Sequence, residues 1–203
     1  MGRTAGATAA GTRERLLRAA ADVFGARGYD GTRVSDIAEA AGLSNGAMYA
    51  YFASKADLLV GAVRAHGRRL LTDLVAADPS RSIADVLLET GRSLRRRPEP
   101  EGYLVIEALV AARRDDALAG SVRPYIRERA DWLAALVQEA QARGEIDPQV
   151  APHAVAHFCV ALAMGSALVP PDLHDVDDEE WAALLTRLVA ALSPRRAQTG
   201  ATT

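Results

Sequence analysis

A helix-capping hydroxyl, an amide and two very small side chains follow one another at Ser44, Asn45, Gly46 and Ala47. Serine often accepts a hydrogen bond from the backbone at the start of a helix, so Ser44 predicts an N-cap and places the next three residues in the first helical turn. In a helix-turn-helix, the first turn of the second helix enters the major groove of DNA. These residues are therefore candidates for contact with DNA.

The residues around this turn have the spacing of two helices joined at a tight corner. Counting Val34 as position one, Ile37 falls at four and Met48 at fifteen, and both are apolar. Ala38, at position five, is small enough for two helices to cross, and Gly42, at position nine, tolerates a left-handed backbone. This spacing predicts a helix-turn-helix. An ordinary pair of packed helices with a glycine at the corner remains the alternative.

The flanking residues extend the pattern on both sides. Gly28-Tyr29-Asp30-Gly31-Thr32 precedes the two helices, and Tyr49-Ala50-Tyr51-Phe52-Ala53-Ser54-Lys55-Ala56-Asp57-Leu58-Leu59 follows them. Together with the corner, these residues resemble the TetR family of one-component bacterial transcriptional regulators. The resemblance covers about residues 12–60 and is only architectural beyond, with Leu43 in place of the usual valine.

The resemblance implies a role in DNA binding for nine residues. A base-reading or phosphate-binding role is expected at the corner before the second helix, in the third helix and just after it, namely at Thr32, Arg33, Ser44, Asn45, Gly46, Ala47, Tyr49, Tyr51 and Lys55. Asparagine can bond the adenine edge, small side chains permit close approach, and tyrosine and lysine contact backbone oxygens. Arg33 departs from the Ser or Thr often found at its position. Tyr51 could equally pack in the core.

Helical patterns run along the whole chain, and no alternating strand pattern is present. We predict an all-α fold of about nine helices, with a three-helix helix-turn-helix domain followed by a second helical domain, which the resemblance implies serves ligand binding and dimerization. The predicted segments are a disordered arm over 1–11, the helix-turn-helix domain over 12–54, the second domain over 55–194 and a disordered tail over 195–203. Ser54 predicts the cap of a long helix over about 55–77, which connects the two domains.

Composition limits the function classes. Apolar residues make up 49% of the 203 residues, enough for a sizeable core, and the net charge of −2 does not by itself favour nucleic acid. The single cysteine, Cys159, excludes an internal disulfide and fits a reducing cytoplasm, where we expect the protein to act. No apolar run approaches the ~20 residues of a membrane helix. No membrane association is expected.

Small and apolar residues dominate the segment from His153 to Leu168. The resemblance implies that the last two helices form a four-helix bundle with their copies in a second subunit, giving a homodimer with two DNA-reading heads. It also implies a small-molecule cavity in the C-terminal helices. Candidate ligand-binding residues, each of which could instead be core, are Tyr103, Glu107, Trp132, His157, Phe158 and Met164. Glu107 could anchor a cationic or hydroxylated ligand, or pair with an arginine.

Motifs for catalysis or metal binding do not emerge. His153 and His157 have a spacing that can bind metal, but no third and fourth ligand is evident, so an interface pair is favoured over a metal site. We expect no enzyme activity, no cofactor and no metal. The resemblance implies a ligand-responsive regulator, a repressor that binds a palindromic double-stranded DNA operator as a homodimer and is released by a small-molecule effector. The alternative is a helical small-molecule-binding dimer that acts as an activator or lacks sequence-specific DNA binding.

Overall fold

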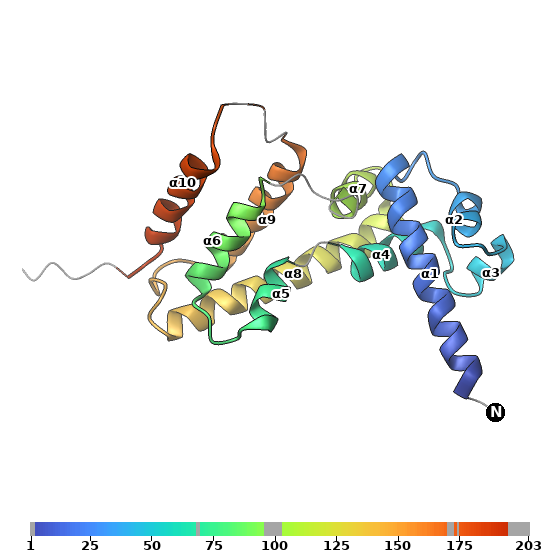
Figure 1. The fold of residues 1–203 in the computed structure, drawn as a ribbon, viewed down its shortest axis with the longest axis horizontal. Coiled ribbons are helices and arrows are strands. Elements are labelled where there is room, and N and C mark those ends of the chain that lie inside the picture. The colour runs from blue at the N-terminus through green and yellow to red at the C-terminus, as the bar shows by residue number, and fades with distance from the viewer. Residues whose placement is uncertain (1–2, 68–69, 96–102, 170–172, 174, 195–203) are drawn as a thin grey trace, which may run out of the picture. The chain divides into compact units, whose positions relative to one another are not determined.

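The computed structural model describes residues 3–67, 70–95, 103–169, 173 and 175–194 (Figure 1). Within these residues the chain forms ten α-helices and no strand, which confirms the predicted all-α class. The helices are α1 (Arg3–Arg27), α2 (Val34–Ala40), α3 (Asn45–Tyr49), α4 (Lys55–His66), α5 (Leu70–Ala77), α6 (Ile83–Ser93), α7 (Leu104–Ala111), α8 (Asp116–Ala142), α9 (Pro152–Leu168) and α10 (Asp178–Ala190). The predicted disordered tail over 195–203 lies outside the described residues.

The chain divides into two compact units that differ from the predicted domains. The N-terminal unit contains residues up to 68 together with 98–127, and the C-terminal unit contains 69–97 and 128–203. The predicted boundary after residue 54 separates α4, α7 and the first part of α8 from the helix-turn-helix. In the structure these elements belong to the same compact unit as the helix-turn-helix.

The core of the N-terminal unit forms where α1 meets α2, α4 and α7. Leu16, Leu17 and Phe24 are buried on one face of α1, at the spacing that an amphipathic helix requires. On α4, Gly61 allows this helix to approach α1 closely, because an added Cβ would lie 2.9 Å from Leu17 Cδ2. Figure 1 shows α2 beside the C-terminal half of α1, and α3 packs against α2.

The C-terminal unit has its own core, in which Val137, Ala140 and Ile146 are almost fully buried. The start of α6 is capped by a distant carboxylate, since Glu145 Oε2 accepts hydrogen bonds from the Ile83 N–H at 2.9 Å and the Ser82 hydroxyl at 3.1 Å. Such a bond satisfies a backbone donor that the helix itself leaves without a partner.

Helices α6 and α10 lie against each other in the C-terminal unit. The Trp181 indole N–H donates to the Gly91 carbonyl at 3.0 Å, and a Cβ on Gly91 would lie 2.9 Å from Leu185 Cδ1. The absence of a side chain on Gly91 therefore permits the close approach of the two helices.

Two helix boundaries differ from those expected. Helix α1 begins at Arg3, where a disordered arm over 1–11 was expected, because the alanines in this stretch favour helix. The helix expected over 55–77 is interrupted after His66, since Gly67 has an extended backbone with φ −59° and ψ 141°. A Cβ on Gly67 would lie 2.4 Å from the Val63 carbonyl oxygen, so only glycine fits this bend.

Candidate nucleic-acid interface and apolar pocket

The corner between α2 and α3 has the geometry expected of a helix-turn-helix. Gly42 has φ +66°, in the left-handed region that favours glycine, and the Leu43 N–H donates to the Ala38 carbonyl at 2.8 Å. Ala38 is 1% exposed, and Ile37 and Met48 are fully buried. The packing predicted from the residue spacing is confirmed, and it holds α3 in a defined orientation relative to α2.

The first turn of α3 presents its residues to solvent. The Ser44 hydroxyl accepts a hydrogen bond from the Ala47 N–H at 3.2 Å, which confirms Ser44 as the N-cap. Asn45 and Gly46 are exposed, and the Tyr49 side chain is 56% exposed. An exposed asparagine in the first turn and an exposed tyrosine at the end of α3 leave hydrogen-bonding groups available for base edges or phosphates.

The corner before α2 uses its donors within the protein. Thr32 is 2% exposed, its hydroxyl donates to the Gly28 carbonyl at 2.7 Å, and its N–H donates to the Tyr29 carbonyl at 3.3 Å. Thr32 therefore fixes the shape of the corner. Arg33 is the N-cap residue of α2 and is exposed; its N–H donates to Asp36 Oδ2 at 3.0 Å.

Lys55 starts α4 beside the same corner. Its Nζ lies 4.2 Å from the centre of the Tyr29 ring, a cation–π contact that holds the ammonium group in place. Burial lowers the pKa of Lys55 below its ordinary value, and the carboxylate of Asp30 acts in the opposite direction. The Ser54 hydroxyl accepts from the Asp57 N–H at 3.0 Å, so the predicted cap of this helix is confirmed. Tyr51 is half-buried.

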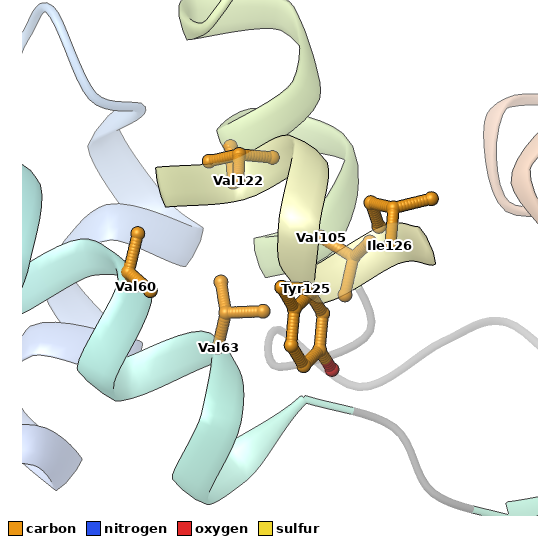
Figure 2. Close-up of a pocket in the computed structure, with 7 residues that line it drawn as sticks. Val60, Val63, Val105, Val122, Tyr125 and Ile126 are labelled. Atoms are coloured by element: carbon orange, nitrogen blue, oxygen red, sulfur yellow. The ribbon is translucent and has the colours of Figure 1, made fainter. Parts of the chain in front are cut away.

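A narrow apolar pocket lies in the N-terminal unit, between α4, α7 and α8 (Figure 2). Its unfilled space is about 210 Å³, part of it open to solvent, although it is too narrow to admit a water-sized sphere. Figure 2 shows Val60 and Val63 on α4 across from Tyr125 on α8. The pocket is lined by Val60, Val63, Val105, Ala108, Val122, Tyr125 and Ile126. Its chemistry suits an apolar group.

None of the six residues proposed for ligand binding from the sequence is among the residues that line this pocket. Tyr103 and Glu107 belong to the N-terminal unit, whereas Trp132, His157, Phe158 and Met164 belong to the C-terminal unit. In that unit, Trp132 is 37% exposed on α8 and Phe158 is 52% exposed on α9. The residues predicted from the sequence are mostly aromatic or polar, whereas the pocket is lined mostly by valines. Valines in a helix pattern are typical of the hydrophobic core, so nothing in the sequence indicated the pocket.

The Glu107 carboxylate has a partner that neither sequence expectation named. Its Oε1 accepts a hydrogen bond of 2.5 Å from the backbone N–H of Tyr29, at the end of α1. It also lies close to Gly28, where an added Cβ would come within 3.1 Å of the same oxygen. Glu107 thus joins α7 to the corner before α2.

Large apolar side chains remain exposed on the last two helices. Phe158 and Leu168 on α9 are 52% and 63% exposed, and Leu184 and Leu188 on α10 are 49% and 43% exposed. Exposed apolar side chains that gather in a patch often mark a protein–protein interface.

The described part of the chain holds no helix that is both long and apolar enough to cross a membrane. Within that part, no three side chains of His, Cys, Asp or Glu gather as a metal-binding group. His153 Nε2 lies 3.5 Å from Asp131 Oδ1, and both side chains are largely exposed.

Both the N-terminal and the C-terminal part of the chain match known protein families. The family described as "Bacterial regulatory proteins, tetR family" matches residues 16–62, and "Tetracyclin repressor-like, C-terminal domain" matches residues 78–192. The chain is 24% identical to the HTH-type transcriptional regulator UidR of Escherichia coli K12 over 171 residues, which cover 84% of each chain.

Solved structures share the fold. Salmonella enterica GusR is similar with a TM-score of 0.72 and 24% identity, covering 90% of this chain and 95% of that one. A transcriptional regulator from Saccharomonospora viridis in complex with choline is similar with a TM-score of 0.70 and 20% identity, covering 92% of this chain and all of that one. With the two family matches together covering most of the chain, this protein belongs to the TetR family of bacterial DNA-binding transcriptional regulators.

Proposed function

We propose that the protein is a repressor that binds a palindromic operator as a homodimer and is released when a small apolar effector enters the pocket between α4, α7 and α8. The observation that carries the proposal is the exposed surface of α3, with Asn45 and Gly46 in its first turn and Tyr49 at its end, on a helix that Ser44 caps and a buried corner orients. Such a turn can enter the major groove without rearrangement.

The DNA contacts are divided by chemistry. Asn45, Gly46, Ala47 and Tyr49 approach base edges, and Arg33, Tyr51 and Lys55 approach phosphates. Thr32 acts through the backbone geometry that it maintains, because its hydroxyl donates its proton to the Gly28 carbonyl. The Ser44 hydroxyl accepts from the Ala47 N–H, so its own proton can be donated to a phosphate oxygen.

The dimer is supported by the apolar side chains exposed on α9 and α10. Two-fold symmetry of a dimer requires two copies of the half-site, separated by about one DNA turn, ~34–36 Å, or a multiple of it. A palindromic operator follows from that symmetry.

The effector is supported by the apolar walls of the pocket, which suit a small molecule with an apolar body. An effector releases the operator only through a higher affinity for the state that does not bind DNA; a ratio of about 10⁴ would turn a 99:1 mixture into 1:99.

The decisive experiment is selection of bound sequences from a random duplex library with the purified full chain at moderate salt. Enrichment of one palindrome is expected. A single half-site without a symmetric copy would contradict the dimeric mode. Failure to enrich any sequence at any salt concentration would favour the second candidate, a helical ligand-binding dimer without sequence-specific DNA binding.

Repression and activation are separated by placing the selected palindrome at a reporter promoter. A repressor lowers reporter output when the protein is expressed, whereas an activator raises it. Point changes in the palindrome that abolish binding should remove either effect.

A further inference from the structure

The contact between Glu107 and Tyr29 links residues 78 positions apart in the sequence. Tyr29 follows directly on Gly28, which ends α1 in the left-handed region with φ +72°. The Gly28 N–H donates to the Phe24 carbonyl at 2.9 Å and closes the end of the helix, whereas the Tyr29 N–H has its acceptor outside α1. The Glu107 carboxylate from α7 supplies the acceptor.

The Glu107 carboxylate lies between the N-terminal end of α7 and the C-terminal end of α1. It belongs to the first turn of α7, where the helix dipole favours an anion, but it faces the C-terminal end of α1, where the dipole disfavours one. The hydrogen bond from Tyr29 offsets this second effect. Glutamine would retain an acceptor oxygen at this position and remove the charge.

The corner held by Glu107 determines how the DNA-binding elements begin. The Gly28 and Tyr29 carbonyls accept the hydrogen bonds of Thr32, which precedes α2. The Tyr29 ring lies under the ammonium group of Lys55, the first residue of α4. A shift of Tyr29 would therefore change the position of Thr32 at the start of α2 and of Lys55, which is predicted to bind phosphate.

The other faces of α7 border the apolar pocket. Val105 and Ala108 line it, and they lie two residues before and one residue after Glu107. Because the pocket is too narrow for a water-sized sphere, a molecule can enter only if its walls separate. Movement of α7 in that process would carry Glu107 with it.

We propose that Glu107 is a positioning residue of the DNA-binding corner, and that it transmits displacement of α7 at the pocket to Tyr29, Thr32 and Lys55. The inference rests on the proposed function, since it assigns the route by which an occupied pocket weakens operator binding. Glu107 itself contacts neither DNA nor effector.

A second contact from the same region provides a matched control. Arg114, just after α7, pairs with Asp30 of the corner at 3.3 Å, but the two side chains are 72% and 74% exposed. Exposed ion pairs contribute little to stability. The hydrogen bond of Glu107 to the backbone, and not the ion pair of Arg114, is assigned the coupling.

The first test compares Glu107→Ala, Glu107→Gln and Arg114→Ala with the unaltered protein. Affinity for the selected palindrome is measured by fluorescence anisotropy, and amide hydrogen exchange is measured at Tyr29. We expect Glu107→Ala to weaken operator binding about 5- to 20-fold and to accelerate exchange at Tyr29. Glu107→Gln and Arg114→Ala should remain within about threefold of the unaltered protein in affinity.

The second test replaces the unidentified effector by a larger pocket side chain. Ala108→Leu adds volume to the pocket from α7, and the double variant Glu107→Ala/Ala108→Leu completes a cycle. We expect Ala108→Leu to weaken operator binding about fivefold when Glu107 is present and to add little when it is replaced. Circular dichroism of each variant verifies that it is helical at the temperature of the assay.

The outcomes separate this inference from the function on which it rests. If the unaltered protein selects no sequence, the proposed function is wrong. If it selects a palindrome and Glu107→Ala binds it equally well, or Ala108→Leu acts equally in both backgrounds, the coupling through Glu107 is overturned. Loss of binding in Glu107→Gln as large as in Glu107→Ala, with Tyr29 exchange unchanged, would also overturn it.

Discussion

At the scale of single residues, Lys55 and Asn45 should affect DNA binding in different ways. Lys55 is placed by Tyr29 beside the corner, and a lysine that neutralises a phosphate acts alike on all sequences. Lys55→Ala should weaken binding to the operator and to unrelated DNA by the same factor and reduce the slope of log affinity against log salt by about 1.

Asn45→Ala should change which base is preferred at one position of the half-site, because an asparagine amide can bond bidentately to adenine. Repeating the selection with Asn45→Ala tests the expectation for base preference, and measuring the affinity of Lys55→Ala for operator and unrelated DNA over a range of salt concentrations tests the phosphate contact. An unchanged base preference in Asn45→Ala would remove its base-reading role, and an unchanged salt slope in Lys55→Ala would remove its phosphate contact.

Cys159 on α9 allows a prediction from acid–base chemistry. Burial raises the pKa of its thiol from 9.0 to about 11. Because only the thiolate reacts, its share at pH 8 falls about a hundredfold, and alkylation by iodoacetamide should slow by a similar factor relative to the unfolded chain. Labelling rates with and without denaturant, followed by mass spectrometry, measure the ratio. Equal rates would show that the thiol is accessible and its pKa ordinary.

Roles that depend on nearby residues could be predicted from the sequence. Contacts between residues far apart in the sequence could not. Ser44 and Ser54 were predictable as caps because a cap is decided within three or four residues. The partner of Glu107 lies 78 residues away, and nothing near either residue indicates it. The valines of the pocket could not be distinguished from core residues in the sequence. What makes them pocket residues is the space left between three helices, which depends on how the helices pack.

At the scale of helices, the crossing of α6 and α10 depends on Gly91. A Cβ there would approach the buried Leu185 to 2.9 Å, so Gly91→Ala should destabilise the protein by about 1–3 kcal/mol through overpacking. Gly120, exposed within α8, has no atom within 4 Å of an added Cβ, and Gly120→Ala should stabilise by about 0.5–1 kcal/mol.

Urea unfolding of the two variants measures the contrast. Opposite shifts of the midpoint are expected, because the gain in helix propensity is common to both and the steric clash is not. A midpoint raised equally in both would show that α6 and α10 can separate without cost.

Helix boundaries were less predictable than helix positions. The bend after His66 depends on Gly67. The sequence alone does not predict a bend there, because Gly61 lies within α4 and does not interrupt it. In the structure, Gly61 lies within α4 and leaves room for Leu17, whereas Gly67 has an extended backbone and approaches the Val63 carbonyl.

At the scale of the whole molecule, the proposed dimer makes the exposed apolar residues of α9 and α10 essential for DNA binding. Phe158→Glu should yield a monomer in sedimentation experiments and weaken operator binding by an order of magnitude or more, because one head alone contacts half of a palindrome. The same substitution at Val110 on α7, which is 42% exposed in the other compact unit, should leave the mass unchanged. A dimeric Phe158→Glu variant would place the interface elsewhere.

The chain leaves or enters the N-terminal unit three times, after residues 68, 97 and 127. A fragment that stops at His66 would lack α7 and the beginning of α8, so faces of α1 and α4 that α7 covers would meet water, and Tyr29 would lose its acceptor. The helix-turn-helix and the helices that pack against it consequently cannot be transferred to another protein through a single fusion point. A chimaera that exchanges the C-terminal unit needs three junctions, because α7 and the beginning of α8, with the pocket that they line, must stay with the helix-turn-helix.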